Sequence, residues 1–171
     1  MRQTTARLPW LLIGMIGGIG NSMILGNFDS TFAAHPEMAL YIPLVGGTGG
    51  NVGTQSSAII VQGLANSSLD AKNTFKQITK ESVVALINAT IISLLVYTYN
   101  FIRFGAPATV TYSVSISLFA VVMFASIFGT LVPMTLEKFK IDPAIATGPF
   151  IAITNDIIGM MLYMGITVLL S

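Results

Sequence analysis

The stretch VSISLFAVVMFASIFGTLVP, residues 114–133, is a run of 20 residues without a charged side chain. A helix of about 20 mostly apolar residues is long enough to cross the hydrocarbon core of a bilayer. Backbone groups in hydrocarbon must be hydrogen-bonded within the segment, and the run is too long and too continuously apolar for a barrel strand. It therefore indicates an all-α membrane protein.

Four further apolar runs accompany this one, and together they predict five membrane-spanning helices. The expected spans are 8–28, 38–65, 83–101, 114–133 and 144–170. The composition agrees, since 53% of the 171 residues are hydrophobic and only 9% are charged, against about 25% charged in soluble domains. We expect a single transmembrane domain, residues 1–171, in a multi-pass protein of the plasma membrane.

Charge and composition exclude several other classes of protein. The net charge of +1 gives no reason to expect a nucleic-acid partner, and the absence of cysteine removes disulfides and thiolate metal sites. A single histidine, His35, is too few for a histidine-based zinc site. No nucleophile has a base beside it and no nucleotide-binding motif occurs, so the sequence does not indicate an enzyme.

The positions of the basic residues predict the orientation in the membrane. Cytoplasmic loops carry an excess of lysine and arginine. Placing the N-terminus in the cytoplasm and the C-terminus outside puts all basic residues but Arg103 on the cytoplasmic side. That side then holds Arg2, Arg7, Lys72, Lys76, Lys80, Lys138 and Lys140.

Asp156 is the only charged residue in the expected fifth span. A carboxylate at such depth costs roughly 2.5–3.5 kcal/mol, and acids in membranes usually line an ion path, pair with a cation or relay protons. The alternative is an aspartate neutralised by a proton or a neighbouring hydroxyl. Ala152 and Gly159 share its helix face, and Pro149 and Tyr163 extend that face. Helix packing explains the two small residues equally well.

The glycine-rich stretch PLVGGTGGNVGTQSS, residues 43–57, divides into two stripes if it is helical. One stripe has small-xxx-small spacing suited to helix contact: Gly46, Gly49, Gly50 and Gly53. The other repeats every four residues and is polar or bare: Pro43, Gly47, Asn51 and Gln55. Amide and carbonyl oxygens near a carboxylate suit a hard cation. The alternative is a packing seam in which Asn51 bonds another helix.

These two motifs resemble those of one known family. PLVGGTGGNVGTQS, residues 43–56, resembles the second transmembrane helix of the MgtE family of magnesium channels. DPAIATGPFIAITNDIIGMMLY, residues 142–163, is similar to the fifth helix, and RLPWL, residues 7–11, fits the first. The resemblance covers essentially the whole chain. It implies a homodimer with a pore on the two-fold axis, lined by helices two and five.

The resemblance also implies roles for individual residues. The central Mg²⁺ site would use Asp156, Asn51 and the backbone carbonyls of Gly47 and Ala152. Acids nearer the cytoplasm would be Asp142 and, on a looser alignment, Glu81. For Asp142 the alternative is an N-cap at the start of the fifth helix, and for Glu81 it is a helix-dipole interaction. Four further residues are expected to line the pore or pack helices: Gln55, Gly50, Gly159 and Tyr163.

The expected function is a magnesium-selective channel that moves hydrated Mg²⁺ into the cytoplasm down its electrochemical gradient. The alternatives are a proton-coupled divalent-cation exchanger and a structural membrane subunit without transport. Mg²⁺ is the expected bound and transported ion, and the expected partners are a second copy of the chain and membrane lipid, with no nucleotide. The cytoplasmic N-terminal and paired CBS domains of the fuller family pattern are expected to be absent from this sequence.

Overall fold

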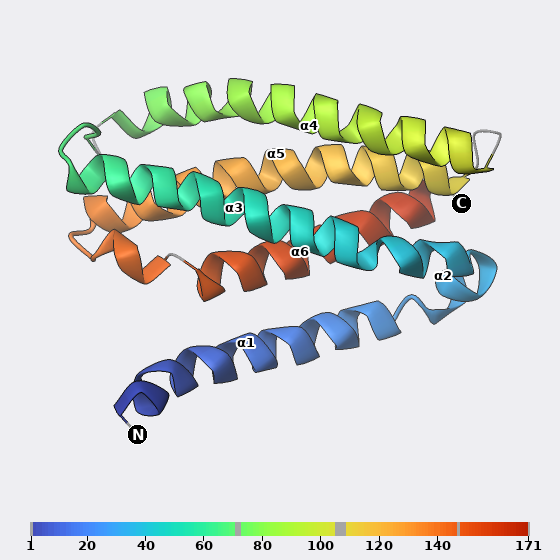
Figure 1. The fold of residues 1–171 in the computed structure, drawn as a ribbon, viewed down its shortest axis with the longest axis horizontal. Helices are drawn as coiled ribbons and strands as arrows, with labels where there is room; N and C mark the ends of the chain where they lie inside the picture. Colours follow the sequence, from blue (N-terminus) through green and yellow to red (C-terminus); the bar gives the residue numbers. More distant parts are fainter. Residues whose placement is uncertain (1, 71–72, 105–108, 147, 171) are drawn as a thin grey trace.

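A computed structural model describes residues 2–70, 73–104, 109–146 and 148–170, and statements about the structure refer to these residues. They form an elongated bundle of helices without a strand (Figure 1). The α-helices are α1 (Arg2–Gly26), α2 (Asp29–Ala34), α3 (Ile42–Ala65), α4 (Thr74–Phe104), α5 (Thr109–Lys138) and α6 (Pro149–Leu170). Two 3₁₀ helices join them: η1 (Pro36–Tyr41) and η3 (Pro143–Ala146). Lys72, one of the lysines that predict the orientation, lies outside the described residues.

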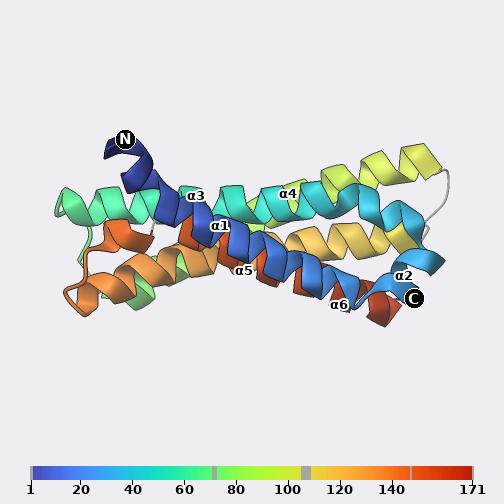
Figure 2. The same ribbon diagram turned by 90° about the horizontal axis from the view of Figure 1, so that it is seen from below.

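The helix α5 forms the centre of the bundle. It packs against α3, α4 and α6, and 56% of its most apolar window is buried, compared with 11% for α4 and none for α1. The main contact of α1 is with α6, which it crosses along one side (Figure 2). The face of α1 that does not meet α6 therefore stays open in the single chain.

Four helices are long and apolar enough to cross a membrane, namely Leu8–Gly26 of α1, α4, α5 and α6. The expected span 38–65 differs from the other four. Its first residues form η1, and α3 begins only at Ile42. With six glycines and several amide and hydroxyl side chains, α3 is not among the four helices whose hydropathy suits a membrane span. The count of five spans therefore stays a prediction.

The helices differ in their bounds from all five expected spans, and the starts of the third and the fifth show why. The third expected helix, α4, begins at Thr74 rather than at residue 83. The charged residues in its first turns are unsuited to hydrocarbon, but they still form a helix outside the membrane. The fifth expected helix, α6, begins at Pro149 rather than at residue 144. Gly148, with a φ of +75°, interrupts the helical backbone between η3 and α6.

A hydrophobic core fills the end of the bundle where η1 meets α5 and α6. Met38 and Tyr41 of η1 pack there against Val114 and Leu118 of α5 and Tyr163 of α6. The Tyr163 hydroxyl donates a hydrogen bond to the Met38 carbonyl over 2.9 Å. This core fixes the register of α3 against α6, which positions the carboxylate of Asp156 beside the glycines of α3.

Candidate ion site between α3 and α6

Asp156 lies about two turns into α6, with its half-buried carboxylate directed at α3. A Cβ added to Gly50 would lie 3.2 Å from the Asp156 Oδ1 atom, and one added to Gly46 would lie 3.8 Å from it. Asp156 accepts no hydrogen bond from another described side chain or backbone amide outside its own helix. The carboxylate therefore faces the bare backbone of α3. A larger residue at Gly46 or Gly50 would fill the space in front of it.

A small cavity of about 70 Å³ reaches the same carboxylate from the side of α1. It is lined by Asp156 and Ile153 of α6 and by four residues of α1: Gly14, Gly17, Gly18 and Asn21. The Asn21 Oδ1 atom is buried without a hydrogen-bond partner among the described residues. A polar cavity of this size can hold more than one water molecule. Asp156 of α6 and Asn21 of α1 thus line the same cavity.

The second stripe of α3 lies on an open face beside this carboxylate. Gly47, Asn51 and Gln55 are all exposed in the single chain. A Cβ on Gly47 would meet no atom within 4 Å. Ala152 is half-buried one turn before Asp156, with its Cα 4.0 Å from a Cβ built on Gly50. Asp156 and Ala152 therefore lie together against α3, at the edge of the face that carries Asn51.

Gly49 and Gly53 of α3 are buried against α5 and α6. A Cβ on Gly49 would lie 2.8 Å from Val121 of α5, and one on Gly53 would collide with the Asn155 amide. Gly129 of α5 lies equally close to α3, because a Cβ on Gly129 would collide with the Gly53 carbonyl oxygen. The glycines thus allow α3 and α5 to approach backbone to backbone.

The structure does not bring Asp142 to this site. Asp142 is exposed, and its Oδ1 accepts a hydrogen bond from the Ala144 N–H over 2.9 Å. Asp142 therefore acts as an N-cap, but it caps η3 and not α6, the expected fifth helix. Among the described residues no three His, Cys, Asp or Glu side chains come close enough to hold a metal ion. Over these residues, a single copy of the chain therefore assembles no site with three such side chains.

Glu81 has partners of a different kind. Its Oε1 atom accepts a hydrogen bond from Ser56 of α3 over 2.8 Å and another from Ser126 of α5, also over 2.8 Å. Because α4 begins at Thr74, Glu81 lies about two turns inside the helix. The helix-dipole alternative for Glu81 is therefore wrong, since that effect falls off within the first turn.

Gly159 and Tyr163 face other helices in the single chain. Gly159 is buried beside Val121 of α5, and a Cβ built on it would lie 3.5 Å from the Val121 Cγ1 atom. Tyr163 is fully buried in the core that contains Met38. Both residues therefore pack helices within the protomer, while Gln55 stays exposed on the open face of α3.

Three polar contributions were missed by the sequence reasoning. Asn21 was hidden in the glycine-rich part of α1, where no charged residue follows Arg7. Asn155 is 1% exposed, and both polar atoms of its amide lack a hydrogen-bond partner among the described residues. The pairing of Ser56 and Ser126 with Glu81 joins residues up to 70 positions apart. The only local signal was that Asn155 immediately precedes Asp156.

Comparison with known proteins identifies the family. Residues 42–166, from α3 to near the end of α6, match the model of MgtE, described as a divalent cation transporter. The chain belongs to the MgtE family. Members of this family are transporters and not enzymes. With its apolar helices of membrane length, the chain is a multi-pass membrane protein.

Relatives named "Magnesium transporter MgtE" align with almost the whole chain. The Bacillus subtilis (strain 168) protein is 33% identical over 94% of this chain and 35% of its own length. The Thermus thermophilus protein is 32% identical over 96% of this chain and 36% of its own length. The Enterococcus faecalis protein is 28% identical over 97% of this chain and 36% of its own length. The chain thus spans about a third of the length of these MgtE relatives.

Proposed function

We propose that this chain forms the pore of a magnesium channel that moves hydrated Mg²⁺ into the cytoplasm down its electrochemical gradient. The observation that carries the proposal is the carboxylate of Asp156, which faces bare glycine backbone in the interior of an MgtE membrane domain. A carboxylate without protein partners in this setting is suited to an ion that passes by. The named relatives make Mg²⁺ the first candidate ion.

The proposal includes a homodimer. One chain contributes one carboxylate at this depth, whereas a two-fold axis would place two copies of Asp156 around a divalent ion. The exposed stripe with Gly47, Asn51 and Gln55 supports such an axis, because these residues face out of the protomer next to Asp156. The pore would then be lined by α3 and α6, with α3 crossing the membrane in addition to α1, α4, α5 and α6.

Magnesium is small and gives up its water reluctantly, so a pore for it contacts the hydrated ion. In the proposed site the oxygens of Asp156, Asn51 and the Gly47 and Ala152 carbonyls hold that hydration shell. Asp142 provides a second carboxylate on the path nearer the cytoplasm. For Glu81 a role in that path stays a prediction, since two serines already occupy its Oε1.

The driving force is the membrane potential, which supplies about 4.6 kcal/mol for a divalent ion crossing 100 mV.

The proposed orientation has the N-terminus inside. It places the end of α5 at Lys138, the following Lys140, and the start of α4 with Lys76 and Lys80 at the cytoplasmic surface.

The test is Mg²⁺ uptake by proteoliposomes that contain this chain alone, with and without an imposed proton gradient. A channel gives uptake that follows the membrane potential and is unchanged by the proton gradient. Uptake that requires the proton gradient would replace the channel by an exchanger. A folded, correctly inserted chain without any uptake would leave only a structural role.

A further inference from the structure

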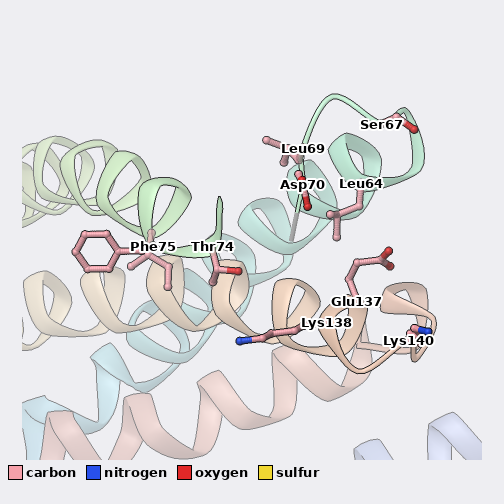
Figure 3. Close-up of a pocket in the computed structure, with 10 residues that line it drawn as sticks. Leu64, Ser67, Leu69, Asp70, Thr74, Phe75, Glu137, Lys138 and Lys140 are labelled. Atoms are coloured by element: carbon pink, nitrogen blue, oxygen red, sulfur yellow. The ribbon is translucent and has the colours of Figure 1, made fainter. Parts of the chain in front are cut away.

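A groove of about 980 Å³ opens where α3 ends, α4 begins and α5 ends (Figure 3). Its apolar wall includes Leu69, after α3, and Phe75 and Ile78 in the first turns of α4. Lys138 at the end of α5 and Lys140 just beyond it provide positive charge. The groove is thus apolar on one side and charged on the other, and none of the proposed pore residues lines it.

The groove lies at the level of the lipid headgroups. The 31 residues of α4 are about 46 Å long, whereas the hydrocarbon core is about 30 Å thick. The part of α4 without charges runs from residue 82 to residue 102, so the turns before it lie outside the hydrocarbon. Phe75, in those turns, is 84% exposed. An aromatic ring in this position is suited to contact with lipid.

The charges in the groove balance each other in number but not in space. Lys138 and Lys140 are accompanied by two carboxylates, Glu137 and Asp70. Glu137, Lys138 and Lys140 make no ion pair with any described residue. In Figure 3 the side chains of Lys138 and Glu137 leave the end of α5 in opposite directions, with Lys138 on the side of Thr74. A ligand with both a negative and a positive group complements this arrangement better than a simple anion does.

Two residues of the groove have a backbone conformation that favours glycine. Ser67 and Lys140, with φ of 54° and 59°, are the non-glycine residues with positive φ in the described chain, and both line the groove. Each follows a helix end closed by a bond of the Schellman type, Ser68 N–H to Gly63 O in one case and Ile141 N–H to Leu136 O in the other. Backbone strain of this kind is often found at functional sites. It agrees with a role in binding for the side chains of Ser67 and Lys140.

We propose that this groove binds the headgroup of an aminophospholipid, a lipid with a phosphate and a free primary ammonium group. The phosphate lies at Lys138, with Lys140 adding positive charge from the other side of Glu137. The ammonium group donates hydrogen bonds to Glu137, and an acyl chain leaves the groove past Phe75 and Ile78 towards the hydrocarbon. This inference rests on the position of the chain in a membrane and is independent of the proposed ion path.

The experiment counts lipids that stay bound to the purified chain in native mass spectrometry. Phosphatidylethanolamine is compared with phosphatidylcholine, which lacks N–H donors, and with phosphatidylglycerol, which lacks the ammonium group. We expect the wild type to retain phosphatidylethanolamine best. Glu137→Gln should remove a roughly tenfold preference over phosphatidylcholine. Lys138→Gln with Lys140→Gln should weaken binding of phosphatidylethanolamine roughly 30-fold.

The matched control is Lys76→Gln with Lys80→Gln, which changes the charge equally at the same surface but outside the groove. This control should retain the lipid. Equal losses in the two double variants, or equal retention of the three lipids by the wild type, would overturn the proposal. A preference for phosphatidylglycerol would overturn it as well. Displacement of the lipid by equimolar glycerophosphoethanolamine, which has no acyl chains, would assign the groove to a soluble ligand instead.

Lys140→Gly separates binding from folding. Glycine adopts the left-handed backbone of this position without strain, so the variant should unfold at a higher temperature than the wild type. Its lipid retention should nevertheless fall. If Lys140→Gly retained the lipid as well as the wild type does, the role of the Lys140 ammonium group would be disproved.

Discussion

Two half-buried acids of this chain, Asp156 and Glu81, have opposite surroundings. Glu81 accepts hydrogen bonds from Ser56 and Ser126, so its Oε1 atom joins α4 to α3 and α5. Asp156 faces Gly46 and Gly50 and a small polar cavity. A half-buried carboxylate needs partners to offset its desolvation. The partners of Glu81 lie within the chain, whereas those of Asp156 must come from water, an ion or a second copy.

The largest expected effect is that of removing the charge of Asp156. Asp156→Asn keeps the shape of the side chain but should lower Mg²⁺ uptake by proteoliposomes at least about 100-fold. A unit charge about 4 Å from an ion contributes about 4 kcal/mol at an intermediate dielectric constant. Thermal unfolding should not occur at a lower temperature, because the aspartate has no partner among the described residues to lose. Uptake within a few-fold of the wild type would exclude Asp156 from the ion path.

Glu81 should affect stability more than transport. Glu81→Ala leaves the Ser56 and Ser126 hydroxyls without their acceptor, and we expect a loss of about 3 kcal/mol in the free energy of unfolding, since hydrogen bonds to charged groups contribute about 1.5–3 kcal/mol. Chemical denaturation in detergent measures this loss.

Glu81→Gln is the control for the same position, because its amide oxygen can still accept both bonds while the charge is gone. This variant should retain most of the stability and most of the Mg²⁺ uptake. A strong fall in uptake with intact stability would instead make Glu81 part of the ion path, and the contrast between the two acids would disappear.

The glycines of α3 provide a graded change at Asp156. A methyl group added by Gly50→Ala would approach the carboxylate to 3.2 Å, whereas Gly46→Ala leaves 3.8 Å. We expect uptake to fall roughly tenfold in Gly50→Ala, which corresponds to about 1.4 kcal/mol, and less in Gly46→Ala. The same liposome assay ranks the two variants. Equal uptake by both would show that the space in front of the carboxylate is not important.

The sequence predicts the helices of this chain better than the partners of their polar residues. Apolar runs indicate α1, α4, α5 and α6 because length and hydropathy are local properties. The boundary errors at Thr74 and Pro149 arose where a helix continues outside hydrocarbon or is interrupted by Gly148. The contact of Ser126 with Glu81 could not be predicted in this way, since it depends on how α4 and α5 pack.

The smallest expected effect is at Asn155, which is adjacent to Asp156 in sequence but buried against Gly53 of α3. Its amide has no hydrogen-bond partner among the described residues, and a buried polar group in this state costs about 1–3 kcal/mol. Asn155→Leu replaces it with an apolar side chain of the same branched shape. We expect a gain of about 1 kcal/mol in the free energy of unfolding, measured by denaturation in detergent, with uptake unchanged. A loss of stability would mean that the amide has a partner in the assembled protein, most directly water or a second copy of the chain. The surroundings of Asn155 would then resemble those of Asp156, which also has to find its partners outside the single chain.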